Sequence, residues 1–223
     1  TLTVVGTGFL ARRISRHEDP ILPLPLLAIP SFRVAISSLF LFGLGFFSSM
    51  LVVVLYLTEM AGYSTVRTGF GVSVLAIMAF TTANFSGRLA DRFGHRRIAV
   101  PGMCSFILGC LWLYQNAGAN PSFFVDVFPA LVLMGAGIGS GPTLLSAAAV
   151  SEVDPSNFSV AGAVAQTARQ LSGAIGISIA VAISGSNADE DAFRATFLYL
   201  TIVAAMSAIA ALKLPAANAT RKL

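Results

Sequence analysis

The sequence predicts an all-α membrane protein, and three observations support this fold class. Hydrophobic residues make up 56% of the 223 residues and charged residues only 11%, whereas about a quarter of the residues in soluble domains are charged. Uncharged runs of roughly 20 residues recur, which is the length that a helix needs to cross a hydrocarbon layer about 30 Å thick. The Lys and Arg residues collect in short clusters between these runs. We therefore expect the lipid bilayer to surround most of the chain, with no stretch left for a soluble domain.

Six of the runs are long enough to be complete membrane spans. They cover residues 34–57, 68–87, 98–114, 127–150, 158–184 and 195–212, within a predicted six-helix transmembrane domain of residues 33–213. Polar residues, glycines and prolines separate each run from the next and favour turns there. Residues 214–223 are polar and basic, and we expect them to form a cytoplasmic tail.

The first 32 residues predict a different organisation. Residues 1–11 are apolar but only half as long as a span, so we expect them to be the end of an upstream transmembrane helix. Residues 12–32, which are rich in Arg and then in Pro and Leu, predict a cytoplasmic linker. Because the chain begins inside apolar sequence without the basic segment of a signal peptide, we expect an N-terminal part of the natural protein to precede it.

The basic residues also predict the orientation of the spans. Lys and Arg accumulate on the cytoplasmic side of short loops. Simple alternation of the six spans places eleven basic residues on one face and two, Arg67 and Arg194, on the other, while Arg169 lies inside a span. If one span had been missed or wrongly added, all later loops would change faces, and the basic residues would no longer collect on one face. We predict a multi-pass protein of the cell (inner or plasma) membrane whose basic loops are cytoplasmic.

Several function classes find no support in the residues. The basic clusters form no stripe with aromatic side chains, so nucleic acid is not an expected partner. Cys104 and Cys110 lie in one apolar run without the spacing of metal ligands, and His17 and His95 lie in predicted loops, so no metal site is expected. HExxH, GxSxG and paired catalytic aspartates are all missing from the sequence. We predict that the protein is not an enzyme.

The most specific local pattern is the run GRLADRFGHRR, from Gly87 to Arg97, between the second and third predicted spans. Gly87 is expected to let the helix end lie close to a neighbour, and Gly94 permits a tight turn. Asp91 is expected to meet a helix N-terminus or an arginine, an ionic contact that can hold one conformation and release in another. An ordinary basic loop explains the arginines but not the ordered Gly, Asp and Gly. We therefore predict a cytoplasmic loop that acts as a conformational switch, formed by Gly87, Asp91, Arg92, Gly94, Arg96 and Arg97.

This run closely resembles the loop motif of the major facilitator superfamily, usually written G-x-L-a-D-r-x-G-r-k/r. The resemblance extends over nearly the whole chain. It is carried by residues 56–57, 62–64 and 69, by the Gly-rich run at 135–142, and by TARQLSGAIG at 167–176. These segments are similar to the last six helices of the drug:proton antiporters with fourteen spans. The apolar residues 1–11 and the basic, Pro-rich residues after them fit the connection that precedes those helices in that family.

The resemblance implies the six-helix C-terminal bundle of the major facilitator fold and a secondary active transporter. It implies proton-coupled efflux of drugs or small metabolites, with the proton gradient as energy source and no cofactor. The implied partners are the lipid bilayer, a small-molecule substrate and the N-terminal half of the same protein. A facilitator for uptake, a channel and a non-transporting membrane scaffold stay open as alternatives, because each would keep the same spans.

Arg169 lies inside the fifth predicted span, where a charge costs at least about 2.5 kcal/mol on insertion scales and needs compensation. Small and polar residues recur around it at helical spacing, so one face of this span is predicted to turn away from lipid. That face consists of Ser159, Gly162, Ala163, Gln166, Arg169, Gln170 and Gly173. Arg169 either contacts a substrate or a carboxylate switching partner, or bonds to backbone carbonyls of neighbouring helices. The candidate contacts of a cavity or an inter-domain surface are Gln166, Arg169, Gln170 and Asn84.

The fourth predicted span contains Gly135, Gly137, Gly139 and Gly141, followed by Pro142. No strand precedes this run and no Lys-Ser/Thr follows it, so it is not a phosphate-binding loop. Glycines let neighbouring backbones approach, and a proline interrupts the hydrogen-bond ladder of a helix. The run predicts tight helix packing, with a gating hinge as the alternative.

Overall fold

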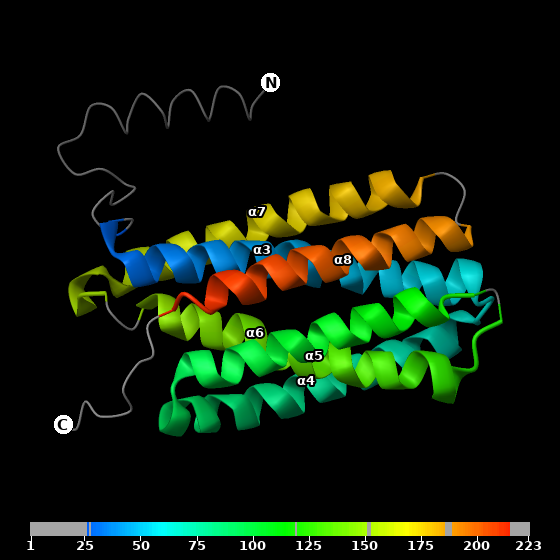
Figure 1. Cartoon of the computed structure of the whole chain (residues 1–223), viewed down its shortest axis with the longest axis horizontal. Coiled ribbons are helices and arrows are strands. Elements are labelled where there is room, and N and C mark those ends of the chain that lie inside the picture. Colours follow the sequence, from blue (N-terminus) through cyan, green and yellow to red (C-terminus); the bar gives the residue numbers. More distant parts are fainter. Residues whose placement is uncertain (1–25, 27, 119, 151–152, 186–188, 215–223) are drawn as a thin grey trace.

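A computed structural model of the chain describes residue 26 and residues 28–118, 120–150, 153–185 and 189–214 (Figure 1). Within these residues the chain forms long α-helices and no strand, which confirms the all-α fold class. The helices are α3 (Pro30–Leu55), α4 (Thr65–Phe93), α5 (His95–Asn116), α6 (Phe128–Val150), α7 (Phe158–Ser184) and α8 (Glu190–Ala211). Single π-helical turns, Tyr56–Met60 and Phe123–Val127, follow α3 and precede α6, and a 3-10 turn, Pro155–Asn157, precedes α7. The predicted upstream helix end, residues 12–25 and 27 of the predicted linker and the tail beyond residue 214 lie outside the described residues. The predicted linker ends too late, because α3 already begins at Pro30.

Five of the six described helices are long and apolar enough to cross a membrane, and α7 is the exception. With 27 residues α7 has the length of a span, but the first half of this helix carries Gln166, Thr167, Arg169 and Gln170. It packs along α3 and runs the length of the bundle (Figure 1). The helix that lacks a sufficiently apolar stretch of span length is thus the one that contains Arg169.

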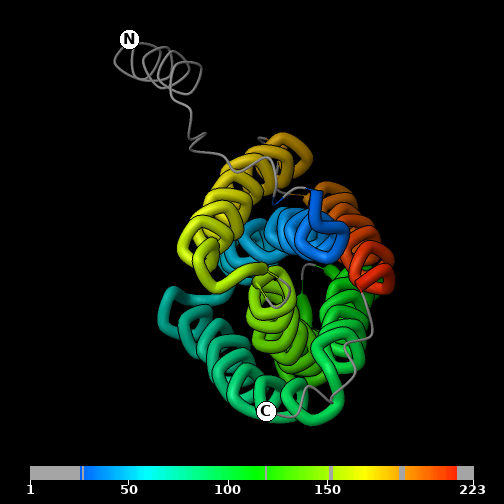
Figure 2. The backbone as a smooth tube through the Cα atoms, turned by 90° about the vertical axis from the view of Figure 1, so that its left-hand side faces the viewer, coloured from blue at the N-terminus to red at the C-terminus, as the bar shows by residue number. Residues whose placement is uncertain are grey.

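The central pair of the bundle is α3 and α6, seen end-on in Figure 2. On one side this pair is flanked by α7, which packs mainly on α3, and by α4, which packs mainly on α6. On the other side it is flanked by α8 and α5, which also pack on each other. Only 17% of the residues in the most apolar stretch of α4 are buried. In the corresponding stretch of α3 and its π-helical turn, 56% of the residues are buried. A broad surface of α4 is therefore left without a neighbour among the described residues.

Glycines bring α6 into backbone contact with α4 and α5. A methyl group added at Gly135 would lie 2.6 Å from a backbone carbonyl oxygen of α4, and one added at Gly137 would lie 2.7 Å from a backbone carbonyl oxygen of α5. A methyl group at Gly139 would overlap the carbonyl of Ala79 in α4. Only residues without a side chain permit such approaches, so the packing predicted for the glycine run is confirmed.

Hydroxyl groups and aromatic rings join α3 to α8. The Ser207 hydroxyl donates to the Ser38 carbonyl at 2.7 Å, and the Ser38 hydroxyl donates to the Ser207 carbonyl at 2.8 Å, all in buried surroundings. Further along, the Tyr56 ring packs edge-on against Phe193 and Phe197, with ring centres 5.5 and 5.6 Å away. In lipid the hydrophobic effect does not draw apolar helices together, so bonds and close contacts of this kind stabilise the pair.

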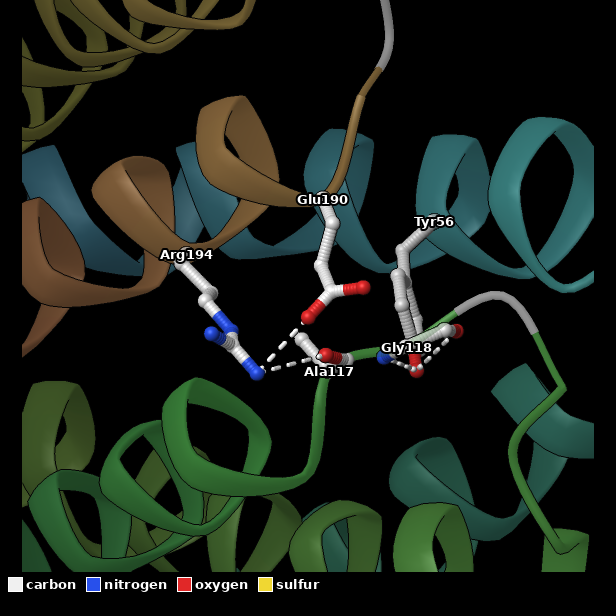
Figure 3. A network of polar contacts seen from close by, with 5 residues as sticks. All are labelled: Tyr56, Ala117, Gly118, Glu190 and Arg194. Carbon is white, nitrogen blue, oxygen red and sulfur yellow. Dashed lines mark hydrogen bonds and ion pairs between the residues drawn. The ribbon is translucent and has the colours of Figure 1, made fainter.

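A polar network links three helix ends where α3 stops and α8 starts (Figure 3). The Arg194 guanidinium binds the Glu190 carboxylate at 2.7 Å and donates to the Ala117 carbonyl at 3.4 Å. The Tyr56 hydroxyl accepts from the Gly118 N–H at 3.4 Å and donates to the Gly118 carbonyl at 3.5 Å. Residues of α3 and α8 thereby hold the connection that follows α5.

The run from Gly87 to Arg97 is almost wholly helical, so the predicted loop is wrong. Helix α4 continues to Phe93 and α5 begins at His95, which leaves Gly94 alone between them. Gly94 has φ 91° and ψ 145°, a backbone conformation that favours glycine, and its N–H donates to the Ala90 carbonyl at 2.8 Å. The predicted tight turn at Gly94 is therefore present. The loop prediction failed because Arg, Leu and Ala favour helix, so α4 continues past the end of its apolar run.

Replacing Gly139 with Ala should destabilise the bundle, because the new methyl group cannot fit without moving α4 away from α6. Overpacking of this kind costs about 1–3 kcal/mol. The apparent melting temperature of the purified protein in detergent should fall. Gly69→Ala is the matched control, since a methyl group there meets nothing within 4 Å. Equal melting temperatures for the two variants would contradict the packing described for α6.

Replacing Gly94 with Ala should also destabilise the protein, through backbone strain rather than through crowding. A side chain at a φ of 91° costs about 1–3 kcal/mol, which either bends the α4–α5 turn or lowers the unfolding temperature. The melting temperature in detergent measures this, with Gly162→Ala as a control at a helical glycine in open space. A Gly94→Ala protein as stable as the Gly162→Ala protein would show that the turn does not require glycine.

Candidate functional site

A small cavity lies where α3, α6 and α7 meet. Its volume is about 150 Å³, and all but one of the residues around it are apolar. The lining consists of Leu39, Phe42, Gly43 and Phe46 from α3, Ile138 and Pro142 from α6, and Arg169 from α7. Two phenylalanines and one arginine therefore border the same space.

Small residues bring α7 close enough to α3 for Arg169 to reach this cavity. A methyl group at Gly176 would lie 2.8 Å from the Cα of Leu44, so the two backbones touch there. Ser172 sits against Gly43, and its hydroxyl donates to the Arg169 carbonyl at 2.7 Å. The helix contact at residues 172–176 thus fixes the backbone of Arg169 beside the cavity.

The Arg169 side chain is partly buried and lacks a partner. Its Nε atom is buried, and within the described part of the chain its guanidinium takes part in no hydrogen bond or ion pair. Among the described residues, no carboxylate lines the cavity. A buried donor without a partner is costly, and the side chain carries a positive charge, so the site favours an anionic group that these helices do not supply. The alternative of bonds to neighbouring backbone carbonyls is not seen among the described residues.

The small and polar face predicted for α7 lies mostly on the outside of the bundle. Ser159, Gly162, Ala163, Gln166 and Gln170 are exposed. The face has only one buried glycine, which packs under a Phe ring of α3. The described helices therefore do not cover this face, and its predicted separation from lipid requires another surface.

The other candidate contacts do not join Arg169 at the cavity. Gln166 and Gln170 lie on the exposed side of α7, and neither lines the cavity. Asn84 is exposed on α4, and its amide donates to the Phe80 carbonyl of the same helix at 2.9 Å. Of the four candidate residues, the structure thus places only Arg169 at the cavity.

Sequence reasoning missed Phe42 and Phe46 as residues of this site. Their spacing of four places both rings on one side of a helix, which was the available signal. This spacing does not tell which side of α3 faces a cavity and which faces lipid, because the helix is largely apolar around its whole circumference. Pro142, considered above as a hinge, is also part of the cavity wall.

The predicted switch residues gather at the α4–α5 turn without forming an ionic latch within the described residues. Asp91 is exposed and has no ion pair there. A methyl group at Gly87 would meet nothing within 4 Å, so the predicted close approach of a neighbouring helix is wrong for this bundle. The reason is that Gly87 lies in the part of α4 that faces away from α5 and α6.

The arginines of this turn make mainly local contacts. The Arg92 guanidinium lies 5.5 Å from the ring centre of Phe93. Arg96 donates to the Leu214 carbonyl at 3.4 Å and so connects the start of α5 to the chain after α8. Arg97 is exposed. The turn presents its basic charge outward, apart from the single contact through Arg96.

Comparison with known proteins agrees with this architecture. The family model for the Major Facilitator Superfamily matches residues 35–223. The chain is 28% identical to the puromycin resistance protein pur8 of Streptomyces alboniger, over 82% of this chain and 36% of that protein. It is 27% identical to the methylenomycin A resistance protein of Streptomyces coelicolor, over 85% of this chain and 40% of that protein. It is 21% identical to the lincomycin resistance protein LmrB of Listeria innocua, over 80% of this chain and 38% of that protein.

The chain spans about two fifths of the length of these curated relatives, whose matched shares are 36%, 40% and 38%. The family match covers all six helices apart from the first turn of α3. An all-α bundle of membrane-spanning helices is the architecture that this match requires. The chain therefore belongs to the major facilitator superfamily, a family of membrane transporters.

Proposed function

We propose that this chain is one helical domain of a proton-coupled exporter of drugs or small metabolites. Membership of the family makes it part of a transporter rather than an enzyme. The names of three relatives record resistance to puromycin, methylenomycin A and lincomycin, which supports outward movement of small molecules. The observation that carries the proposal is Arg169, which lines a cavity together with two phenylalanines and whose buried Nε has no partner among the described residues.

A second helical domain, the N-terminal half of the same protein, is part of the proposal because this bundle leaves two helices uncovered on one side. On that side of the central pair lie α7, with its exposed small and polar face, and α4 (Figure 2). The large apolar side chains that α4 exposes include Phe70, Phe80 and Phe85. A domain of similar build against these helices would place the Arg169 cavity near the interface. Transporters whose two helical repeats rock about a central site have this arrangement.

Within that arrangement Arg169 meets a carboxylate, either on the substrate or on the second domain. A carboxylate beside a guanidinium keeps a low pKa while the pair is in contact, and it takes up a proton more readily once the pair separates. Contact in one conformation and separation in the other would couple proton movement to domain movement. The rings of Phe42 and Phe46 would hold the flat apolar part of a substrate beside this charge.

The orientation proposed from the sequence has support in the arrangement of the helices. Alternating helix directions put six basic residues of the described chain at one end of the bundle: Arg33, Arg88, Arg92, Arg96, Arg97 and Lys213. The opposite end has only Arg67 and Arg194. In line with the positive-inside rule, we propose that the α4–α5 turn lies in the cytoplasm of a cell whose plasma or inner membrane contains the protein.

Replacing Arg169 with Ala should reduce export about ten- to a hundredfold, because a hydrogen bond to a charged group contributes about 1.5–3 kcal/mol. Drug accumulation in cells that express the full chain, with any N-terminal region that its gene encodes, measures this. Thr167→Ala is the matched control, since Thr167 is exposed on the same helix and its hydroxyl donates to the Ala163 carbonyl of that helix. Unchanged export at normal expression of Arg169→Ala would end the functional role assigned to this residue.

Export should stop when the proton gradient is collapsed, because the proposed mechanism moves the substrate in exchange for protons. Uptake of a fluorescent dye that carries a carboxylate into inverted membrane vesicles provides the measurement, with a protonophore added while ATP is kept constant. Export that continues under these conditions would contradict proton coupling. Dye flow down its own gradient, independent of protons, would identify an uptake facilitator, and substrate-independent ion current would identify a channel.

A further inference from the structure

A groove opens between α3 and α8, away from the Arg169 cavity and without a lining residue in common with it. Its volume is about 420 Å³. Residues of both helices line it, including Arg33, Ser37 and Leu41 from α3 and Met206 and Ile209 from α8, together with Lys213 just after the end of α8. The start of α3 and the end of α8 lie at the same end of the bundle (Figure 1), so the two basic residues border one mouth.

Polarity changes with depth along this groove. Leu41 lies eight residues beyond Arg33, and Met206 lies seven residues before Lys213, so both apolar side chains are roughly 10–12 Å deeper along the helix axes. The mouth therefore has two cations and one serine hydroxyl, and the interior has only apolar side chains. A glycerophospholipid has the same order, with a phosphate at the membrane surface and acyl chains below it.

The two cations have no ionic partner within the described part of the chain. No acidic residue lines the groove, and the ion pair between Arg194 and Glu190 is at the opposite end of the bundle. Lys213 and Arg33 are both exposed. Basic pockets between transmembrane helices on the cytoplasmic side attract anionic headgroups, so the charge of this mouth complements a lipid phosphate.

We propose that this groove is a binding site for an anionic glycerophospholipid of the cytoplasmic leaflet. Arg33 and Lys213 bind the phosphate, Ser37 donates a hydrogen bond to the headgroup, and one acyl chain lies against Leu41 and Ile209. A zwitterionic lipid binds less well, because its headgroup amine or choline meets the two cations. The lipid holds α3 and α8 together at the end of the bundle that is opposite the network of Figure 3.

Native mass spectrometry of the full chain in detergent, with equal amounts of phosphatidylglycerol and phosphatidylcholine, tests the charge requirement. We expect phosphatidylglycerol adducts to survive at several-fold higher abundance than phosphatidylcholine adducts. The double variant Arg33→Gln/Lys213→Gln should lose this preference, whereas Arg33→Lys/Lys213→Arg should keep it. Arg67→Gln, which removes a cation at the other end, should also keep it. Loss in Arg67→Gln as large as in the double variant would overturn the proposal in favour of non-specific charge attraction.

A second pair of variants tests the shape of the groove without changing charge. Ile209→Trp should fill the groove and reduce phosphatidylglycerol adducts several-fold. Ile202→Trp is the matched control, because Ile202 is an exposed isoleucine of the same helix that does not line the groove. Equal adduct abundance in these two variants would overturn the proposal.

Two further outcomes would replace the proposed occupant. If glycerol phosphate, which has no acyl chain, competes as well as phosphatidylglycerol, the site binds free phosphate rather than lipid. If cysteine at position 37 forms a disulfide with cysteines introduced at residues 12–25, and added phosphatidylglycerol does not reduce this cross-link, the chain itself occupies the groove. Both outcomes leave the Arg169 measurements unaffected, so a failure here is distinct from a failure of the proposed function.

Discussion

Inside a bilayer, apolar side chains gain little by leaving lipid for the interior of a protein, so this bundle depends on close backbone contact between its helices. The contact is closest along α6, where glycines at alternate positions meet carbonyl groups of α4 and α5. It recurs between α7 and α3, where Gly176 meets the backbone of Leu44. Dispersion attraction falls steeply with distance, so these approaches provide more stabilisation than the same helices would gain across larger side chains.

The same constraint explains where Arg169 lies. Helix α7 packs on α3 through small residues. A long side chain next to these residues lies at the edge of the contact between the two helices, and on α7 that side chain belongs to Arg169. Arg169 lines the same cavity as Phe42 and Phe46, and its side chain has no partner within the described residues. The cost of this unpaired charge is acceptable in a transporter, because a site that stays unsatisfied in one domain is ready for a ligand or a second domain.

Much of the fold follows from the sequence, since charge-free runs and loop charges define helices that cross lipid. The turn at Gly94 and the packing of α6 were also predictable, because each needs a residue without a side chain. The helical course from Gly87 to Phe93 was not, since the end of an apolar run marks the exit from the membrane and not the end of the helix. Amphipathicity identified a distinct face on α7, but it could not show that the described helices leave Gln166 and Gln170 uncovered. Phe42 could not be assigned to a cavity because α3 is apolar on every side.

The network of Tyr56, Arg194 and the chain after α5 has a mechanical consequence. It ties α3, α5 and α8 at one end, and the paired serines of α3 and α8 fix those two helices nearer the other end. Together with α6, these helices make a stiff four-helix unit. By comparison α4 and α7 are attached mainly along one side, through α6 and α3. If a partner domain exerts force on the bundle, we therefore expect α4 and α7 to bend or shift, while the four-helix unit moves as a rigid body.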